Sequence, residues 1–190
     1  MADVRPGETV VVVGCGGIGM NAIQGAALAG AENVVAVDPL AFKREQAKIF
    51  GATHTAASME EAAGLVSQLT QGANADKAIL TASVAEGHLI APLMALVKKA
   101  GRAVVTAVAP ISQEDVKLNL FDFAMQRKEL VGTIFGNANP RRDIPHLLHL
   151  YQAGKLKLDE LVTRTYDLED INQGYQDMRD GSNIRGVVKY

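Results

Sequence analysis

Residues 10–30 read VVVVGCGGIGMNAIQGAALAG and leave this chain few folds to choose from. Four valines run directly into a loop with four glycines in six residues, and an alanine-rich stretch follows. This order predicts a buried strand, a tight turn and a helix. Side chains are almost absent between Gly14 and Gly19, which indicates that another group comes very close to the backbone there.

Apolar runs of four to six residues alternate with longer stretches of helical spacing along residues 1–135. Such alternation is typical of a parallel sheet covered by helices. The predicted strands are 9–13, 33–37, 53–56, 77–80, 103–108 and 130–134, and the predicted helices are 17–29, 39–50, 59–69 and 86–99. We therefore predict an α/β fold, a doubly wound parallel Rossmann sheet of about six strands with helices on both faces.

The second part of the chain, residues 136–190, has a different character. Its pattern predicts a helix from Ile144 to Gly154, a second helix with Asp167 as its N-cap and Gly181 as its C-terminal stop, and a short final strand in NIRGVVKY. A tail of about 55 residues is too small to bury a separate core well. We therefore expect an incomplete α+β domain after residue 135.

The glycine loop fits the pattern G-x-G-x-x-G with Gly14, Gly16 and Gly19, directly after a predicted strand and at the start of a predicted helix. In that setting the first glycine permits the turn, the second lets the backbone touch a pyrophosphate, and the third lets the helix pack on the strand. The free N–H groups of the helix start, around Gly17 and Ile18, then receive phosphate oxygens. The loop is predicted to bind a diphosphate, although a purely structural turn, a flavin site and a methyl-donor site are alternatives.

An acidic residue ends the second predicted strand, where VVAVDP places Asp38 about 20 residues after the glycines. A carboxylate there accepts hydrogen bonds from ribose hydroxyls and repels a 2′-phosphate, so the motif favours NAD over NADP. Lys43, one helical turn further on, is placed to reach the same ribose. Simpler interpretations stay open: Asp38 as a helix N-cap before Pro39, and Lys43 as an ordinary solvent-exposed lysine.

The charge pattern excludes several classes of partner. Nineteen Lys and Arg residues stand against 21 Asp and Glu, and basic pairs such as Lys98-Lys99 are isolated, so no surface for nucleic acid is expected. No apolar run approaches the roughly 20 residues that span a bilayer, so no membrane partner is expected. The start MADVRPGET has no apolar leader and the single Cys15 has no cysteine to pair with, so we expect a cytoplasmic protein.

Residues that bind metal ions are scarce. One cysteine and four scattered histidines, His54, His88, His146 and His149, do not make a zinc site of three or four protein ligands. No Ser-His-Asp or paired-carboxylate arrangement stands out either. We therefore predict neither a metal site nor a catalytic residue in this chain.

Three long segments resemble one family in matching order. They are RPGETVVVVGCGGIGMNAIQGA, VVAVDPLAFKREQAKIFGATH and LVGTIFGNANPRRDIPHLLHLYQAGKLKLDELVTRTYDLEDINQGYQDMRDGSNIRGVV, and the family is the medium-chain, zinc-type alcohol dehydrogenases. Within it the chain is similar to the actinobacterial nicotinoprotein (NDMA-dependent) enzymes. The resemblance implies an NAD-binding domain at 1–135 and, at 136–190, the C-terminal portion of a GroES-like catalytic domain whose N-terminal zinc-bearing part is absent.

The resemblance also implies roles for single residues around the cofactor. The loop from Gly14 to Gly19 would cradle the pyrophosphate, Asp38 and Lys43 would hold the adenosine ribose, and Thr81 would line the adenosine side. Arg185 in SNIRG matches an arginine that reaches back to the pyrophosphate, whose oxygens a guanidinium can hold bidentately. A surface arginine is the simpler alternative.

Four further positions match residues at the nicotinamide end. The backbone of Thr106 and Val108 in TAVAP would border the nicotinamide, and main-chain groups of Thr133 and Phe135 in GTIFG would hold its carboxamide. Core packing alone is the alternative for Thr106, Val108 and Thr133, because they lie on predicted buried strands.

The implied parent reaction is hydride transfer from a primary alcohol to NAD⁺, giving an aldehyde, with a zinc ion as Lewis acid. Because this chain lacks zinc ligands, we expect it to bind NAD(H) without catalysis by itself. Alternatives are a non-catalytic NAD-binding module, a subunit that needs a partner carrying the zinc domain, and a methyltransferase, which would have no use for GTIFG and SNIRG.

The resemblance finally implies a homodimer that pairs edge strands within Val116–Val131. Without the rest of the catalytic domain, apolar tail residues should form an exposed patch that favours association. These residues are Leu147, Leu148, Leu150, Leu161 and Ile171.

Overall fold

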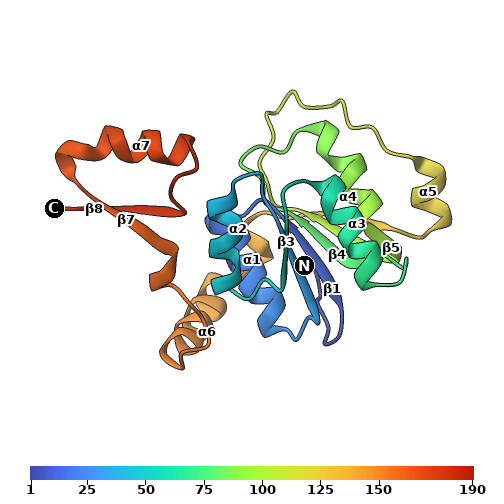
Figure 1. Ribbon diagram of the computed structural model, residues 1–190, viewed down its shortest axis with the longest axis horizontal. Helices are drawn as coiled ribbons and strands as arrows, with labels where there is room; N and C mark the ends of the chain where they lie inside the picture. Colours follow the sequence, from blue (N-terminus) through green and yellow to red (C-terminus); the bar gives the residue numbers. More distant parts are fainter.

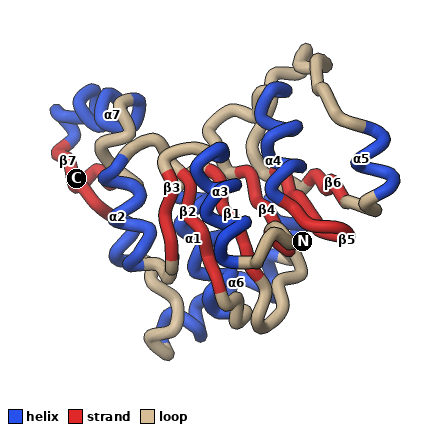
Figure 2. The backbone as a smooth tube through the Cα atoms, turned by 45° about the vertical axis from the view of Figure 1, so that its right-hand side comes forward, coloured by secondary structure: helices blue, strands red, loops and turns tan.

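A computed structural model describes residues 1–190 of the chain. Its main feature is a six-stranded parallel sheet (Figure 1). The strands lie in the order β3-β2-β1-β4-β5-β6, which can be followed in Figure 2. The strands are β1 Thr9–Val13, β2 Asn33–Val37, β3 His54–Ala56, β4 Ala75–Leu80, β5 Val97–Val105 and β6 Glu129–Gly132. The predicted doubly wound sheet is confirmed.

Helices cover both faces of this sheet (Figure 2). Residues of α1 Gly17–Leu28 and α2 Ala41–Ile49 pack on one face, and residues of α3 Met59–Leu69 and α4 Ile90–Leu96 pack on the other. The remaining helices are α5 Leu120–Met125, α6 Pro140–Gln152 and α7 Ile171–Arg179. None of them combines the length and the apolar character that crossing a membrane requires.

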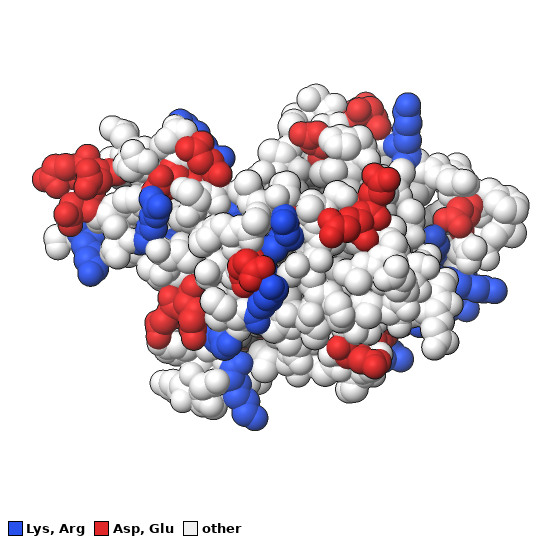
Figure 3. Space-filling model, viewed as in Figure 1, with Lys and Arg blue, Asp and Glu red and all other residues white.

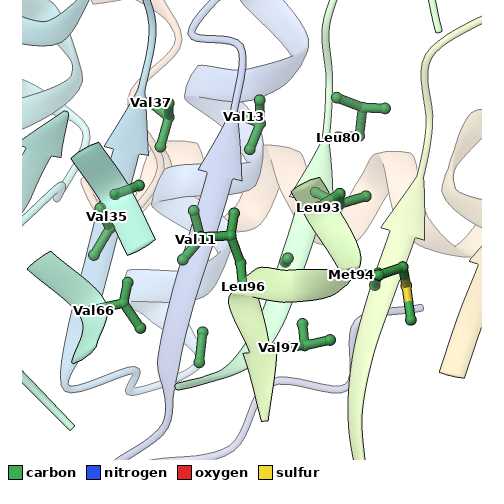
Figure 4. Packing of buried hydrophobic residues seen from close by; sticks show 14 of the residues in the cluster. Val11, Val13, Val35, Val37, Val66, Leu80, Leu93, Met94, Leu96 and Val97 are labelled. Carbon is green, nitrogen blue, oxygen red and sulfur yellow. The ribbon is translucent and has the colours of Figure 1, made fainter. Parts of the chain in front are cut away.

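The run of four valines lies in the central strand β1, and all four are buried because both faces of the sheet are covered. Val11 and Val13 face α3 and α4 and belong to the same buried cluster as Val66 of α3 and Leu93 of α4 (Figure 4). The alternate valines pack on the opposite side, against α1 and α2. The side-chain period of a strand thus divides one apolar run between two halves of the core.

The segment after β4 differs from the prediction. A single helix over 86–99 is wrong, because a short 3₁₀ turn, Gly87–Leu89, leads into α4 and α4 ends at Leu96. Val97 takes extended dihedral angles and pairs with Ala75 of β4, so β5 begins six residues before the predicted position 103. Pairing with a neighbouring strand here outweighs the local preference of a lysine-containing segment for helix.

Smaller differences concern two strand ends and a helix. β5 ends at Val105 instead of 108, and β6 ends at Gly132 instead of 134. The sequence pattern does not predict α5, which has only six residues. It begins after Asn119, whose side chain accepts a hydrogen bond from the Asp122 N–H group, and this cap stabilises a helix too short to show a period.

The tail begins with α6, four residues earlier than the predicted start at Ile144. The side chain of Asn139 accepts a hydrogen bond from the Arg141 N–H group, and Pro140 occupies the first helical position. Both residue types are favoured at these places, because asparagine satisfies a free N–H group and proline has none to lose.

The last part of the tail is a β-α-β unit, in which β7 Val162–Asp167 and β8 Arg185–Lys189 pair in parallel and α7 connects them. The final strand was predicted and β7 was not. Asp167 is the N-cap of a 3₁₀ turn, Leu168–Asp170, that runs directly into α7, and the N-cap of α7 itself is Asp170. The predicted N-cap is therefore found at the start of the 3₁₀ turn, although its side chain makes no capping hydrogen bond. Gly181 lies just beyond α7 with φ +67°, as expected of a C-terminal stop.

A short connection holds the tail on the sheet domain. The side-chain amide of Gln24 in α1 donates to the Lys157 carbonyl at 3.0 Å and accepts from the Lys157 N–H group at 3.0 Å. Leu161 is only 5% exposed and packs in the core on the α1 side, so its place in an exposed patch is wrong. Leu147 and Leu148 are about half exposed, as expected. The predicted domain boundary after residue 135 stays a prediction.

The sheet ends at β6, which has no further strand beside it. The neighbouring helix α5 exposes large apolar side chains, with Leu120, Phe121 and Met125 all more than 60% accessible. Exposed apolar groups beside an open sheet edge are typical of association surfaces. The expected homodimer at Val116–Val131 stays a prediction.

Candidate functional site

A cleft of about 630 Å³ lies at the carboxyl ends of β1, β2, β4 and β5. The strand order reverses between β1 and β4, and ligands of doubly wound sheets bind at this switch point. Most predicted site residues line this cleft, namely Gly14, Gly16, Gly17, Ile18, Asp38, Lys43, Thr81, Thr106 and Val108.

Gly14 makes the tight turn out of β1. Its φ is +97°, and an added Cβ would lie 2.9 Å from the backbone nitrogen of Ala82. Its N–H group donates to the Val37 carbonyl at 2.8 Å, which joins the turn to the end of β2. The turn therefore needs glycine both for its left-handed backbone and for the close approach of β4.

Gly19 lies where α1 packs back onto the turn. A Cβ there would collide with the carbonyl oxygen of Gly14 and lie 2.9 Å from the Thr81 hydroxyl. That hydroxyl is within hydrogen-bond distance of two carbonyl oxygens, Gly14 at 2.6 Å and Val13 at 3.1 Å. Thr81 thus holds the glycine loop in addition to lining the cleft.

Gly16 has no neighbour within 4 Å of its Cβ position, so its backbone is open to the cleft. It is the N-cap of α1 and offers no side-chain acceptor to the first turn of the helix. The first α1 hydrogen bond runs from the Met20 N–H group to the Gly16 carbonyl at 2.9 Å. The N–H groups before Met20 are therefore available to an anion at the positive end of the helix dipole.

Asp38 is 5% exposed and stands at the end of β2. Its two carboxylate oxygens accept hydrogen bonds from the Cys15 N–H group and the Leu40 N–H group, both at 2.9 Å. These hydrogen bonds orient the carboxylate at the wall of the cleft. The remaining lone pairs of its oxygens can accept hydrogen bonds from a ligand. The simpler interpretation of Asp38 as the cap of the next helix is wrong, because Leu40 is the N-cap of α2.

Cys15 is fully buried under the glycine loop, with its Sγ 3.6 Å from the Val37 carbonyl oxygen. Burial, followed by the negative charge of Asp38, raises the pKa of this thiol to about 12. Only a thiolate reacts readily with disulfides or alkylating reagents. Cys15 is therefore a packing residue of the loop.

We expect that a disulfide reagent at pH 8 does not modify Cys15 in the native protein. The same reagent should modify Cys15 fully once the protein is unfolded in guanidinium. Fewer than about one native thiol in 1,000 is ionised at that pH, against more than one in ten in an unfolded chain. The folded state keeps its proton while the unfolded state loses one above about pH 8.5, so this group lowers stability as the pH rises toward 12. Rapid native labelling at pH 8 would contradict the buried position.

Two basic side chains approach the cleft from different elements. Lys43 lies on α2, and its Nζ is 3.2 Å from the Cβ position of Gly181 in the turn after α7. Arg185, the first residue of β8, brings its Nη2 to 2.7 Å from the Cβ position of Gly17. Arg185 thus lies over the start of α1, beside a groove of about 450 Å³ that also borders Gly17.

The predicted nicotinamide residues divide into two groups. Thr106 and Val108 line the cleft, with the Thr106 hydroxyl 3.0 Å from the Leu80 carbonyl oxygen and Val108 79% exposed, so core packing does not explain Val108. Thr133 and Phe135 do not line the cleft. The Thr133 N–H group donates to the Val105 carbonyl at 3.1 Å, and Phe135 is 89% exposed beyond β6.

Several lining residues have no clear signal in the sequence. Pro39, Leu40, Ser58, Met59, Met178 and Asn183 belong to this group. Asn183 is 6% exposed and also borders the groove beside Arg185. In the sequence, its only link to the site is its place two residues before Arg185. The others reach the cleft through turns and helix ends whose position depends on the whole fold.

The surface charge and the scarcity of metal-binding residues limit the kinds of ligand that the chain can hold. On the face drawn in Figure 3, Lys and Arg side chains are mixed with Asp and Glu, without a continuous basic surface. No three His, Cys, Asp or Glu side chains come together in a way that could hold a metal ion. The residues present therefore do not fit a zinc ion.

A parallel sheet of this strand order, with a glycine loop at its switch point, defines the doubly wound Rossmann class. Residues 17–153 match the family described as zinc-binding dehydrogenase, and the chain belongs to this family. The resemblance to the zinc-type alcohol dehydrogenases is thereby confirmed.

The relatives agree with this assignment. The chain is 51% identical over 187 residues to the NDMA-dependent alcohol dehydrogenase of Amycolatopsis methanolica, a match that covers 98% of this chain and 50% of that protein. It is 47% identical over 189 residues to alcohol dehydrogenase B of Mycobacterium tuberculosis, covering 100% of this chain and 50% of that protein. The chain thus spans about half the length of these curated relatives.

Solved structures give the same result. Benzyl alcohol dehydrogenase from Acinetobacter calcoaceticus superposes with a TM-score of 0.90 at 26% identity, covering 99% of this chain and 51% of that one. A zinc-binding dehydrogenase from Sinorhizobium meliloti, solved with NADP bound, has a TM-score of 0.76 at 26% identity, covering 90% of this chain and 49% of that one.

Proposed function

We propose that this chain is the NAD(H)-binding portion of a zinc-dependent alcohol dehydrogenase and that it binds the cofactor without oxidising alcohols by itself. One observation carries the proposal: the open helix start at Gly16, the carboxylate of Asp38 and the guanidinium of Arg185 surround the switch point of the sheet. The cofactor, when bound, supplies the hydride acceptor of the family's reaction.

In this proposal, different residues contact different parts of the dinucleotide. The N–H groups at the start of α1 and the Arg185 guanidinium would hold the pyrophosphate, because both present donors to anionic oxygens. Asp38 and Lys43 would hold the adenosine ribose beside Thr81. Main-chain groups of four residues would border the nicotinamide and its carboxamide, namely Thr106, Val108, Thr133 and Phe135.

We assign the zinc ion, and with it the oxidation of a primary alcohol, to the part of the relatives that this chain does not span. Supporting this, the only cysteine is buried, and no metal-binding cluster is present among the 190 residues. Residues 136–190 favour an enzyme portion over a free-standing NAD sensor, because Arg185 of the tail lies at the glycine loop.

The proposal predicts a preference for NADH over NADPH in calorimetric titration of the purified chain. Asp38 would accept hydrogen bonds from the 2′-hydroxyl and repel a 2′-phosphate. Asp38→Asn removes the charge and also leaves one backbone N–H group, of Cys15 or Leu40, facing an amide N–H₂ group instead of an acceptor. Loss of a charge-assisted hydrogen bond of roughly 1.5–3 kcal/mol to the ribose corresponds to roughly a 10- to 100-fold weaker affinity for NADH. The preference over NADPH should shrink in parallel.

Asp167→Asn is the matched control, because this aspartate is exposed on β7 and away from the cleft lining. It should bind NADH as the unmodified chain does. Equal affinities of the unmodified chain for NADH and NADPH, or no binding of either, would contradict the cofactor assignment. Alcohol-dependent formation of NADH by the metal-supplied chain would contradict the absence of catalysis.

A further inference from the structure

The β7–α7–β8 unit contains a buried hydrogen-bond network that the proposed cofactor contacts do not use. Asp177 on α7 is 5% exposed, and its carboxylate accepts from the Tyr166 hydroxyl at 2.7 Å and from the Gln173 amide at 2.9 Å. Asn183 donates to the same Tyr166 oxygen at 3.0 Å, and Arg164 forms an ion pair with Asp177. The polar atoms of the network are satisfied within the unit.

Asp177 is held as a carboxylate. The hydrogen bond from Tyr166, followed by those from Gln173 and Arg164, lowers the pKa of its carboxyl group below its usual range. At neutral pH the group therefore acts only as an acceptor, so the Tyr166 hydroxyl must donate to it. The Tyr166 oxygen therefore accepts from Asn183. The hydrogen bonds of the network all run in one direction, from Asn183 through Tyr166 to Asp177.

This network holds the backbone just before and after Arg185. The Ile184 N–H group donates to the Thr163 hydroxyl at 2.9 Å, and Arg185 is in register with Val162 of β7. On the other side, a Cβ on Gly186 would lie 2.7 Å from Cε2 of Tyr166, so the tyrosine ring packs directly on the strand. The base of the Arg185 side chain is therefore restrained from both sides.

The Arg185 side chain leaves this restrained backbone and reaches the start of α1 at Gly17. The residue itself is exposed, and no hydrogen bond or ion pair within the chain orients its guanidinium. A long, flexible side chain holds an oxyanion in a bidentate way only if its base is placed accurately. In this structure the placement comes from the backbone of residues 183–186.

We propose that Asp177 and Tyr166 are positioning residues: through Asn183 they place Arg185 over the pyrophosphate site at the start of α1. This inference rests on the proposed binding of NAD(H). The affinity for a ligand that carries a diphosphate then depends on two buried side chains that contact no part of it. The network acts on the anionic middle of the dinucleotide and leaves the adenosine ribose site at Asp38 unaffected.

The test is a double-mutant cycle in the full chain, with NADH binding measured by fluorescence titration. Tyr166→Phe keeps the ring against Gly186 and removes the hydroxyl, and Asp177→Asn removes the charge. Each should weaken NADH binding about tenfold in the unmodified background. In an Arg185→Ala background, neither should weaken binding further, because the placed group is gone.

Tyr151→Phe is the control, because it also removes a tyrosine hydroxyl that donates to an aspartate, Asp159 at 2.7 Å, but on α6. It should leave NADH affinity unchanged. If Asp177→Asn does not fold, Tyr166→Phe decides the question alone. Unchanged NADH affinity in Tyr166→Phe, or an equal loss in both backgrounds, would overturn the positioning role while NADH binding by the unmodified chain supports the cofactor site. No NADH binding by the unmodified chain would overturn both proposals.

Discussion

Replacing Gly19 with alanine will weaken NADH binding at least about 100-fold and lower the free energy of unfolding by about 3 kcal/mol. The added methyl group would collide with the Gly14 carbonyl oxygen and crowd the Thr81 hydroxyl. Neither neighbour can move away easily. The Thr81 hydroxyl lies 2.6 Å from that carbonyl oxygen, and the Gly14 N–H group donates a hydrogen bond to the Val37 carbonyl. The start of α1 must therefore move away from the turn, and its free N–H groups move with it. Urea unfolding and NADH titration measure the two losses.

Variants at two other glycines of the same region distinguish an effect on packing and stability from an effect on NADH binding. Gly25→Ala, also in α1, has no neighbour within 4 Å and should raise stability by up to about 1 kcal/mol with unchanged binding. Gly16→Ala has equal space and an ordinary φ of −80°, so it should keep its stability but bind NADH more weakly, because the methyl group occupies the approach of the pyrophosphate. A stable Gly19→Ala protein with normal affinity would show that the loop is not closely packed.

Gln24→Ala is expected to lower the free energy of unfolding by about 2 kcal/mol and to make the tail more sensitive to protease. The two hydrogen bonds between the Gln24 amide and the Lys157 backbone join segments 133 residues apart. Without them, an N–H group and a carbonyl group in a partly buried place lose their partners. The segment that carries Leu156 and Leu161 into the core would then open more often. Urea unfolding and limited proteolysis, with the first cleavage sites identified by mass spectrometry, test this result.

Gln68→Ala on α3 is the matched control, because Gln68 is exposed and makes no side-chain hydrogen bond within the chain. Its stability should stay within about 0.5 kcal/mol of the unmodified chain. If both glutamine variants are equally stable, or if Gln24→Ala is cleaved first within the sheet domain, the Gln24 contact does not hold the tail.

The sheet and most of the cleft could be predicted because their signals are local. The apolar runs and the glycine loop identify β1 and α1 together, and a positive φ at Gly14 is what the turn requires of that residue. Asp38 follows β2 directly, so its place at the carboxyl edge of the sheet depends only on that strand being parallel to β1. Parallel strands bring their carboxyl ends to one edge, which makes such a site readable from spacing alone.

The errors occur where a distant partner outweighs local preference. β7 was missed because VTRTYD has little apolar alternation, and it forms a strand by pairing with β8 around α7. The lysine-containing start of β5 likewise forms a strand by pairing with β4. Asn183 and Asp177 look like ordinary polar residues of a turn and a helix, and their burial depends on Tyr166 lying opposite them.

The sequence by itself determined the class of sheet, the order of its first elements, the glycine loop and the acidic residue beside it, because each rests on residues close together in the chain. The family resemblance implied that Arg185 reaches the glycine loop, where the structure places it at Gly17. Only the tertiary structure decided that the tail packs on α1 through Gln24 and that Leu161 is buried. These contacts join the tail to α1 residues more than 130 positions earlier, and no local pattern records them. Their geometry follows from the packing of complete elements, which is settled when the whole core forms.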